Sequence, residues 1–138
     1  MVWTTADEVQ WNLSNPFRQF LGVQVGGIED GEAEILLPVG PQLLQAYGVV
    51  HGGVYCTLID TVLGTAVRAA AGYDARPATL DLNVSFLRAA GPGQLRACAR
   101  IIKPGRRVMV GLGEVYDADG HQVAVGRGSF MVGAAPPD

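Results

Sequence analysis

The stretch from Gly48 to Gly72 constrains the fold of this chain more than any other. It reads GVVHGGVYCTLIDTVLGTAVRAAAG, so a His-Gly-Gly start leads into a long run with helical spacing. Apolar side chains cover most of that run: Val54, Tyr55, Leu58, Ile59, Val62, Leu63, Ala66 and Val67. A helix that is apolar on almost every side is typical of a protein core. The sequence therefore predicts one long buried helix that the remaining elements must cover.

A polar stripe interrupts this apolar surface. Its members recur at spacings of three and four, which places them within one arc at about 100° per residue. They are Gly53, Thr57, Asp60, Thr61, Gly64, Thr65 and Arg68. Asp60 is the only acidic residue of the stretch. On the stripe alone, we interpret it as facing solvent or joining a local network, with a catalytic use of Asp60 as the alternative.

Two glycines, Gly52 and Gly53, stand at the expected start of the helix and leave the backbone there uncovered. The first turn of a helix carries N–H donors without helical partners and a partial positive charge. Such an end can receive an anion or polarise a carbonyl oxygen. We therefore expect the helix start to be a binding position.

The composition limits the possible classes of protein. A chain of 138 residues fits one domain with a sizeable core. Only 17% of the residues are charged, which is sparse for the surface of a free monomer and indicates burial between subunits. The formal net charge of -3 gives no general electrostatic case for binding nucleic acid or an anionic membrane.

Cysteines and targeting signals are sparse. Cys56 and Cys98 lie in apolar contexts outside any close Cys/His cluster, so we expect core thiols and no metal site, with a disulfide left open. The N-terminal residues MVWTTADEVQ lack the basic and apolar regions of a signal peptide. No apolar run approaches transmembrane length. We expect a cytoplasmic protein.

The rest of the chain predicts strands around the long helix. Residues 7–20 form a short amphipathic helix that breaks near Asn15-Pro16, with an inner face of Val9, Leu13, Phe17, Phe20 and Leu21. Two strands occupy residues 22–38, and a loop over 40–50 contains Gln45. Alternating patterns predict four further strands over 79–87, 95–102, 108–116 and 122–132. Short turns imply antiparallel pairing.

The predicted fold class is therefore α+β, with a curved antiparallel sheet wrapped around one long central helix. We expect a single domain over residues 1–138. Residues 1–20 form its N-terminal helical segment, and residues 133–138 form a frayed tail.

Three motifs together carry a resemblance to a known family. They are Gly48-x-x-His51-Gly52-Gly53, then Leu58-x-Asp60, and finally Leu82-Asn83-x-x-Phe86-Leu87-Arg88. With them the chain resembles hotdog-fold thioesterases from about Phe17 to Val132. It is most similar to the phenylacetate-degradation type and to one class of 4-hydroxybenzoyl-CoA thioesterases.

The resemblance implies a catalytic set. Asp60 matches the carboxylate that acts as nucleophile or as general base for water. Gly52, with Gly53 beside it, matches the backbone N–H that polarises the thioester carbonyl. Gln45, fifteen residues before the acid, matches a side-chain amide near the thioester or the water. His51 has either a direct catalytic role or the simpler role of capping the helix.

Substrate-binding positions follow from the same resemblance. Some members carry a Thr or Ser one turn after the acid, where this chain has Gly64 with Thr61 and Thr65 nearby. A small residue there would instead widen the acyl pocket. Cations are expected for the CoA phosphates, and the candidates are Arg88, Lys103, Arg106 and Arg107. The alternative for the last three is a solvated hairpin tip.

The implied protein is an acyl-CoA thioesterase for an aromatic or medium-chain acyl group. It would need no cofactor, because CoA is part of the substrate. It would form a dimer or tetramer with the active site at the subunit interface. The alternatives are a non-catalytic acyl-CoA-binding protein and a hotdog hydratase or dehydratase; the missing histidine within the helix counts against the latter.

Overall fold

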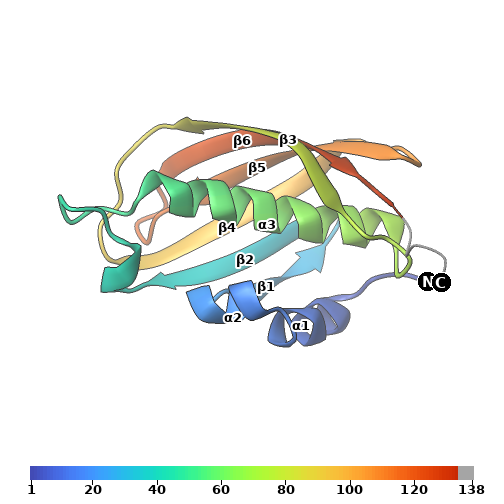
Figure 1. Cartoon of the computed structure of the whole chain (residues 1–138), viewed down its shortest axis with the longest axis horizontal. Coiled ribbons are helices and arrows are strands. Elements are labelled where there is room, and N and C mark those ends of the chain that lie inside the picture. Colours follow the sequence, from blue (N-terminus) through green and yellow to red (C-terminus); the bar gives the residue numbers. More distant parts are fainter. Residues whose placement is uncertain (134–138) are drawn as a thin grey trace.

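A computed structural model describes residues 1–133 and shows one sheet wrapped around one long helix (Figure 1). The helices are α1 (Thr5–Leu13), α2 (Pro16–Leu21) and α3 (Gly52–Ala71), with a short 3-10 turn, η1 (Pro41–Leu43). The strands are β1 (Gln24–Glu29), β2 (Glu32–Val39), β3 (Ala78–Phe86), β4 (Gly93–Lys103), β5 (Val108–Tyr116) and β6 (Gln122–Met131). The predicted hotdog fold is confirmed. Apart from Gly133, the expected frayed tail lies outside the described residues.

The described strands form a single antiparallel sheet in the order β1-β2-β4-β5-β6-β3. β3 therefore leaves its sequence neighbours and pairs with the last strand, β6, so that Phe86 faces Ala124. β1 and β3 lie at the two edges. Helix α3 crosses the concave side, while α1 and α2 lie beside β1 (Figure 1).

Glycines on β5 and β6 let α3 approach the sheet. A Cβ atom on Gly111 would lie 2.5 Å from a methyl group of Leu63, and one on Gly113 would lie 3.1 Å from a methyl group of Ile59. Gly126 and Gly128 on β6 face the same two side chains at 3.1 and 3.0 Å. Side chains at these four positions would push the helix off the sheet, so the glycines fix its depth.

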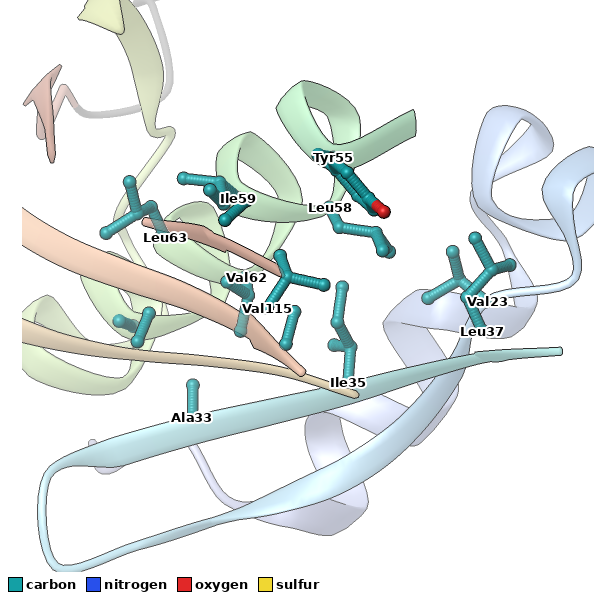
Figure 2. Close-up of a cluster of buried hydrophobic side chains, with 14 of the residues drawn as sticks. Val23, Ala33, Ile35, Leu37, Tyr55, Leu58, Ile59, Val62, Leu63 and Val115 are labelled. Carbon is teal, nitrogen blue, oxygen red and sulfur yellow. The ribbon is translucent and has the colours of Figure 1, made fainter. Parts of the chain in front are cut away.

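The core lies between α3 and the sheet. Figure 2 shows Leu58, Ile59 and Val62 of α3 gathered with Ile35 of β2 and Val115 of β5. All five side chains are at most 1% exposed. Burying an aliphatic side chain of this size contributes about 1.5–3 kcal/mol, so this contact is the main source of stability.

We expect from the sequence that no apolar run reaches transmembrane length. Judged by length and composition alone, this expectation is wrong. Within residues 1–133, α3 is the one helix long and apolar enough to cross a membrane. Its position explains the apolarity, because α3 packs against β2, β3, β4, β5 and β6 as the core helix.

The expected inner face of the N-terminal segment is wrong except for Leu21, which packs against the core. Leu13, Phe17 and Phe20 are 60, 56 and 79% exposed. The buried residues of α1 and α2 are polar: Glu8, Asn12 and Arg18. Helical spacing marks two faces of opposite polarity, and here the polar face turns inward because α3 offers polar partners to it.

Candidate active site

His51 caps the start of α3. Its Nδ1 atom accepts a hydrogen bond from the Gly53 N–H at 2.9 Å. A neutral imidazole with an accepting Nδ1 carries its proton on Nε2. His51 thus caps the helix, which is one of its two predicted roles. The Gly53 N–H is already occupied by this hydrogen bond.

The N–H of Gly52 remains available. It is the first residue of α3, and no acceptor for its N–H is found within residues 1–133. The Phe86 ring lies against it, since a Cβ atom at Gly52 would be 3.3 Å from the ring edge. Of the two glycines, Gly52 therefore presents the free donor at the positive end of the helix.

A closed loop places Gln45 at this same end of α3. The Gln45 N–H donates to the Val49 carbonyl at 2.8 Å, and the His51 N–H donates to the Leu43 carbonyl at 3.0 Å. The side-chain oxygen of Gln45 accepts from the Tyr47 N–H. Its NH₂ group is then left to donate. The loop thus leaves the side-chain NH₂ group of Gln45 without an acceptor within residues 1–133.

Asp60 lies half-buried farther along the same stripe, and β3 orients it. The Thr79 hydroxyl donates to Asp60 Oδ1 at 2.5 Å. Donation from a hydroxyl to a carboxylate is a strong contact that fixes the carboxylate direction. The sequence analysis missed Thr79. Its only signal is its place at the start of the strand that carries the Asn-x-x-Phe-Leu-Arg motif.

The second half of the polar stripe on α3, with Thr65 and Arg68, is buried beneath the N-terminal segment. Glu8 is fully buried and accepts from Arg18 at 2.9 Å, from Arg68 at 2.8 Å and from the Thr65 hydroxyl at 2.7 Å. The Trp3 indole N–H donates to the same carboxylate at 2.6 Å. Within residues 1–133, no buried side-chain nitrogen or oxygen lacks a hydrogen bond. Thr65 and Arg68 are therefore structural.

The cations around Glu8 decide its ionisation. Burial alone would raise the pKa of Glu8, but the hydrogen bond and charge of Arg68, the charge of Arg18 and the Thr65 hydrogen bond outweigh it. The pKa of Glu8 consequently lies below its ordinary value. The carboxylate is charged at neutral pH and holds α1, α2 and α3 together.

The comparisons with known proteins fit this arrangement. A family model described as the thioesterase superfamily matches residues 47–124, which include the end of the loop, α3, β3, β4 and β5. The chain belongs to the thioesterase superfamily. The resemblance that the sequence motifs indicated is confirmed, and so is the enzyme class of thioester hydrolase.

Relatives of this thioesterase match most of its length. A Halobacterium salinarum protein with the provisional name of an esterase is 44% identical over 124 residues, 82% of each chain. An Escherichia coli protein named 1,4-dihydroxy-2-naphthoyl-CoA hydrolase is 27% identical over 73% of this chain and 74% of its own. A solved thioesterase from Haemophilus influenzae has a TM-score of 0.89 at 26% identity, covering 99% of this chain and 98% of its own.

The remaining expected site residues divide between the two ends of the thioesterase sheet. Arg88 lies near the start of α3, where its carbonyl accepts from the Tyr55 hydroxyl at 3.4 Å. Lys103, Arg106 and Arg107 lie at the β4–β5 turn, near the other end of β3, because Ala78 and Val108 both face Met131. All four side chains are exposed, and none forms an ion pair within residues 1–133.

Thr61 and Gly64 flank Asp60 on α3. Thr61 is half-buried, and its carbonyl oxygen lies 3.3 Å from the Thr65 hydroxyl oxygen, whose hydrogen is donated to Glu8. Gly64 is buried, yet a Cβ atom there would meet only Arg68 Nη1, at 3.9 Å. The fold therefore has room for a small side chain at Gly64, and sterics do not require the glycine.

Within residues 1–133, one group of side chains could hold a metal ion. Ligand atoms of Asp117, Asp119 and His121 lie within 4.8 Å of one another at the β5–β6 turn. The Asp117 carboxylate already accepts from the backbone N–H groups of Asp119 and His121 at 3.0 and 2.9 Å. These bonds close the hairpin, and we assign the group to the turn.

Another hollow lies away from the site. It has a volume of about 460 Å³ near β1 and β2 and is lined on the outer side of the sheet by Glu32, Glu34, Arg96 and Cys98. Cys98 and Cys56 are free and only half-buried, so the expectation that both are core residues is wrong. Cys98 faces outward because the buried neighbours Ala97 and Ala99 take the inner positions of β4.

Proposed function

We propose that this thioesterase hydrolyses an acyl-CoA to the free acid and CoA, with Gly52 and Asp60 as its central groups. The observation that carries the proposal is the free Gly52 N–H at the start of α3, beside a neighbouring N–H that His51 occupies. The relatives named as CoA thioester hydrolases support CoA as the carrier.

The reaction needs two kinds of help. Attack on the thioester carbon places negative charge on the carbonyl oxygen, which the Gly52 N–H would stabilise. The Asp60 carboxylate would either take a proton from the attacking water or attack the carbon itself. In the first route the C–S bond then breaks, the free acid forms, and CoA leaves as the thiol with the proton that Asp60 took from water. In the second route the C–S bond breaks as CoA leaves as the thiolate, and water then hydrolyses the acyl anhydride on Asp60 to give the free acid and a proton for the thiolate. The Thr79 hydroxyl would orient Asp60, and the Gln45 NH₂ group would contact the thioester or the water.

A complete site requires a second chain. Asp60 follows Gly52 by eight residues, which is about 12 Å along a helix axis. One helix cannot bring both groups to the same carbonyl. The outer edge of β3 supports a partner here, since Leu80 and Phe86 are 51 and 57% exposed. We propose a homodimer or homotetramer in which Gly52 of one chain works with Asp60 of another.

The exposed cations complete the proposal. Arg88, or the turn of Lys103, Arg106 and Arg107, would contact the CoA phosphates. No cofactor is proposed, since the carboxylate and the backbone N–H suffice for thioester hydrolysis. The small Gly64 would leave space beside Asp60, and Thr61 would line that space. We propose a cytoplasmic location for the enzyme.

The test is release of free thiol from a panel of acyl-CoAs by the wild type and by Asp60→Asn. We expect turnover by the wild type and a loss of about 10²–10⁴-fold in kcat in the variant, the range for a positioned acid or base. Unchanged melting temperature would show that the fold persists. Full activity in Asp60→Asn would contradict the mechanism. Binding without turnover in the wild type would favour the non-catalytic alternative.

A further inference from the structure

A cleft of about 230 Å³ opens beside the first turns of α3. Gly53, Val54 and Thr57 of α3 form one side of it. The opposite side includes Leu21 at the end of α2 and Leu44 of the loop. The cleft thus begins at the helix turn that would hold the thioester carbonyl and extends toward the N-terminal segment.

The chemistry of the walls is aliphatic. Leu21, Leu37, Leu43, Leu44 and Val54 line the cleft, and no aromatic side chain within residues 1–133 joins them. The Thr57 hydroxyl donates to the Gly53 carbonyl at 2.9 Å, so its hydrogen-bonding need is met within the helix. Polar groups of His51 and Gln42 also line the cleft. Such a cleft favours an apolar chain that has a polar head.

Leu21 is the wall residue that the N-terminal segment supplies, and Arg18 fixes its position. The two residues are one helical turn apart on α2, so both point inward while Phe17 and Phe20 stay exposed. Arg18 Nη2 donates to the Thr65 hydroxyl at 3.0 Å, and Arg18 Nη1 donates to Glu8 at 2.9 Å. The buried network therefore anchors α2 against α3 and sets the width of the cleft.

We propose that this cleft takes the acyl group of the substrate, that the group is an unbranched aliphatic chain of medium length, and that Leu21 sets the length limit. The proposal rests on the proposed thioesterase function and narrows its substrate class. The volume supports it, because the cleft is smaller than the roughly 300–1,000 Å³ of sites for drug-sized ligands. Aliphatic walls of this size suit a flexible chain better than a fused aromatic ring.

The test compares kcat/KM for straight-chain acyl-CoAs from butyryl to myristoyl, with benzoyl- and phenylacetyl-CoA added. The ratio of interest is kcat/KM for the longest good substrate divided by kcat/KM for the shortest. Leu21→Ala enlarges the cleft, so this ratio should rise about tenfold. Leu21→Phe fills the cleft and should lower the same ratio about tenfold, with butyryl-CoA little affected. A purely structural role of Leu21 would change all substrates equally.

Two further variants keep the result interpretable. Phe20→Ala, next to Leu21 but 79% exposed and outside the cleft, is the matched control and should leave the ratio unchanged. Leu44→Ala, on the loop side of the cleft, should move the ratio in the direction of Leu21→Ala. It replaces the Leu21 variants if they fail to fold.

The outcomes separate this inference from the proposed function. Wild-type hydrolysis with the same ratio in every cleft variant would overturn the inference alone, and so would a preference for benzoyl- or phenylacetyl-CoA over the aliphatic series. If the wild type hydrolyses no thioester, the proposed function fails. In that case, calorimetry with S-octyl-CoA, a thioether that cannot be hydrolysed, would decide whether the cleft binds the acyl chain. Weaker binding to Leu21→Phe than to Phe20→Ala would support the cleft, and equal binding would overturn it.

Discussion

The two halves of the polar stripe on α3 look alike in sequence and differ in use. The first half, with Gly53, Thr57 and Asp60, stays accessible and carries a carboxylate directed by one hydroxyl. The second half, with Thr65 and Arg68, is sealed by Glu8 from a segment about 60 residues earlier in the chain. The N-terminal segment thus decides which polar positions remain free for chemistry.

Removing the buried carboxylate should break the sealed half and spare the open one. Glu8→Gln leaves two buried guanidinium groups without their counter-charge, which typically costs about 3–5 kcal/mol. Chemical denaturation should show this loss, while kcat per folded molecule for butyryl-CoA, which depends little on the width of the cleft, stays near the wild-type value. The exposed Glu29→Gln is the control. A variant of unchanged stability would show that the network contributes little.

Removing the free Gly52 N–H should impair catalysis in the open half of the stripe and leave the sealed half intact. Gly52→Pro deletes the free donor without breaking the helix, since proline is accepted at the first position of a helix and His51 already has the extended backbone that proline requires before it (φ -63°, ψ 136°). We expect kcat to fall about 10²–10³-fold, the range for losing one oxyanion donor.

Gly52→Ala is the matched control for this variant. It keeps the N–H and adds a Cβ atom beside the Phe86 ring, so any steric effect of the ring contact appears in both proteins. Equal kcat in the two variants would assign the loss to sterics and remove Gly52 as the donor.

Thr79→Val sharpens the comparison within the open half. The change keeps the side-chain shape and removes the hydroxyl that holds Asp60. A hydrogen bond to a charged group contributes about 1.5–3 kcal/mol, so a loss of roughly tenfold or more in kcat is expected. Thr79→Ser retains the hydroxyl and should recover most of the rate. Failure of serine to recover it would make the Thr79 methyl group the important part.

Acid should weaken the sealed half by a smaller amount. Because the pKa of Glu8 is lower in the folded chain than in the unfolded one, its charge adds stability above the unfolded value of about 4.3. That contribution is lost as pH falls through the lower folded value. The wild-type melting temperature should therefore drop more steeply below pH 5 than that of Glu8→Gln. Parallel curves for the two proteins would exclude Glu8 as the source.

The fold was largely predictable because its signals are local. The alternation over residues 79–87 predicted β3, and the apolar run after His51 predicted α3. The inner face of the N-terminal segment was not predictable in this way. Phe17 and Phe20 look like core residues until the structure shows polar partners on α3 for the other face.

The candidate site was predictable as a set of positions, without their individual roles. Gly52 and Gly53 are equivalent in the sequence, and only the direction of the His51 ring separates them. Thr79 and Asp60 come together because β3 returns to α3 after a turn, a contact that no spacing rule gives. Side-chain direction and long-range pairing therefore account for what the sequence analysis missed.

The pairing of β3 with β6 has a consequence for how the chain is made. β3 is synthesised before β4, β5 and β6, yet among the described strands its one partner is the last. During N-to-C synthesis, β3 must wait for nearly the whole chain to emerge, and such distant pairing is slow. The carboxylate of Asp60 thus gains its Thr79 partner among the final events of folding. A nascent or truncated chain that lacks β6 would have α3 but no oriented acid.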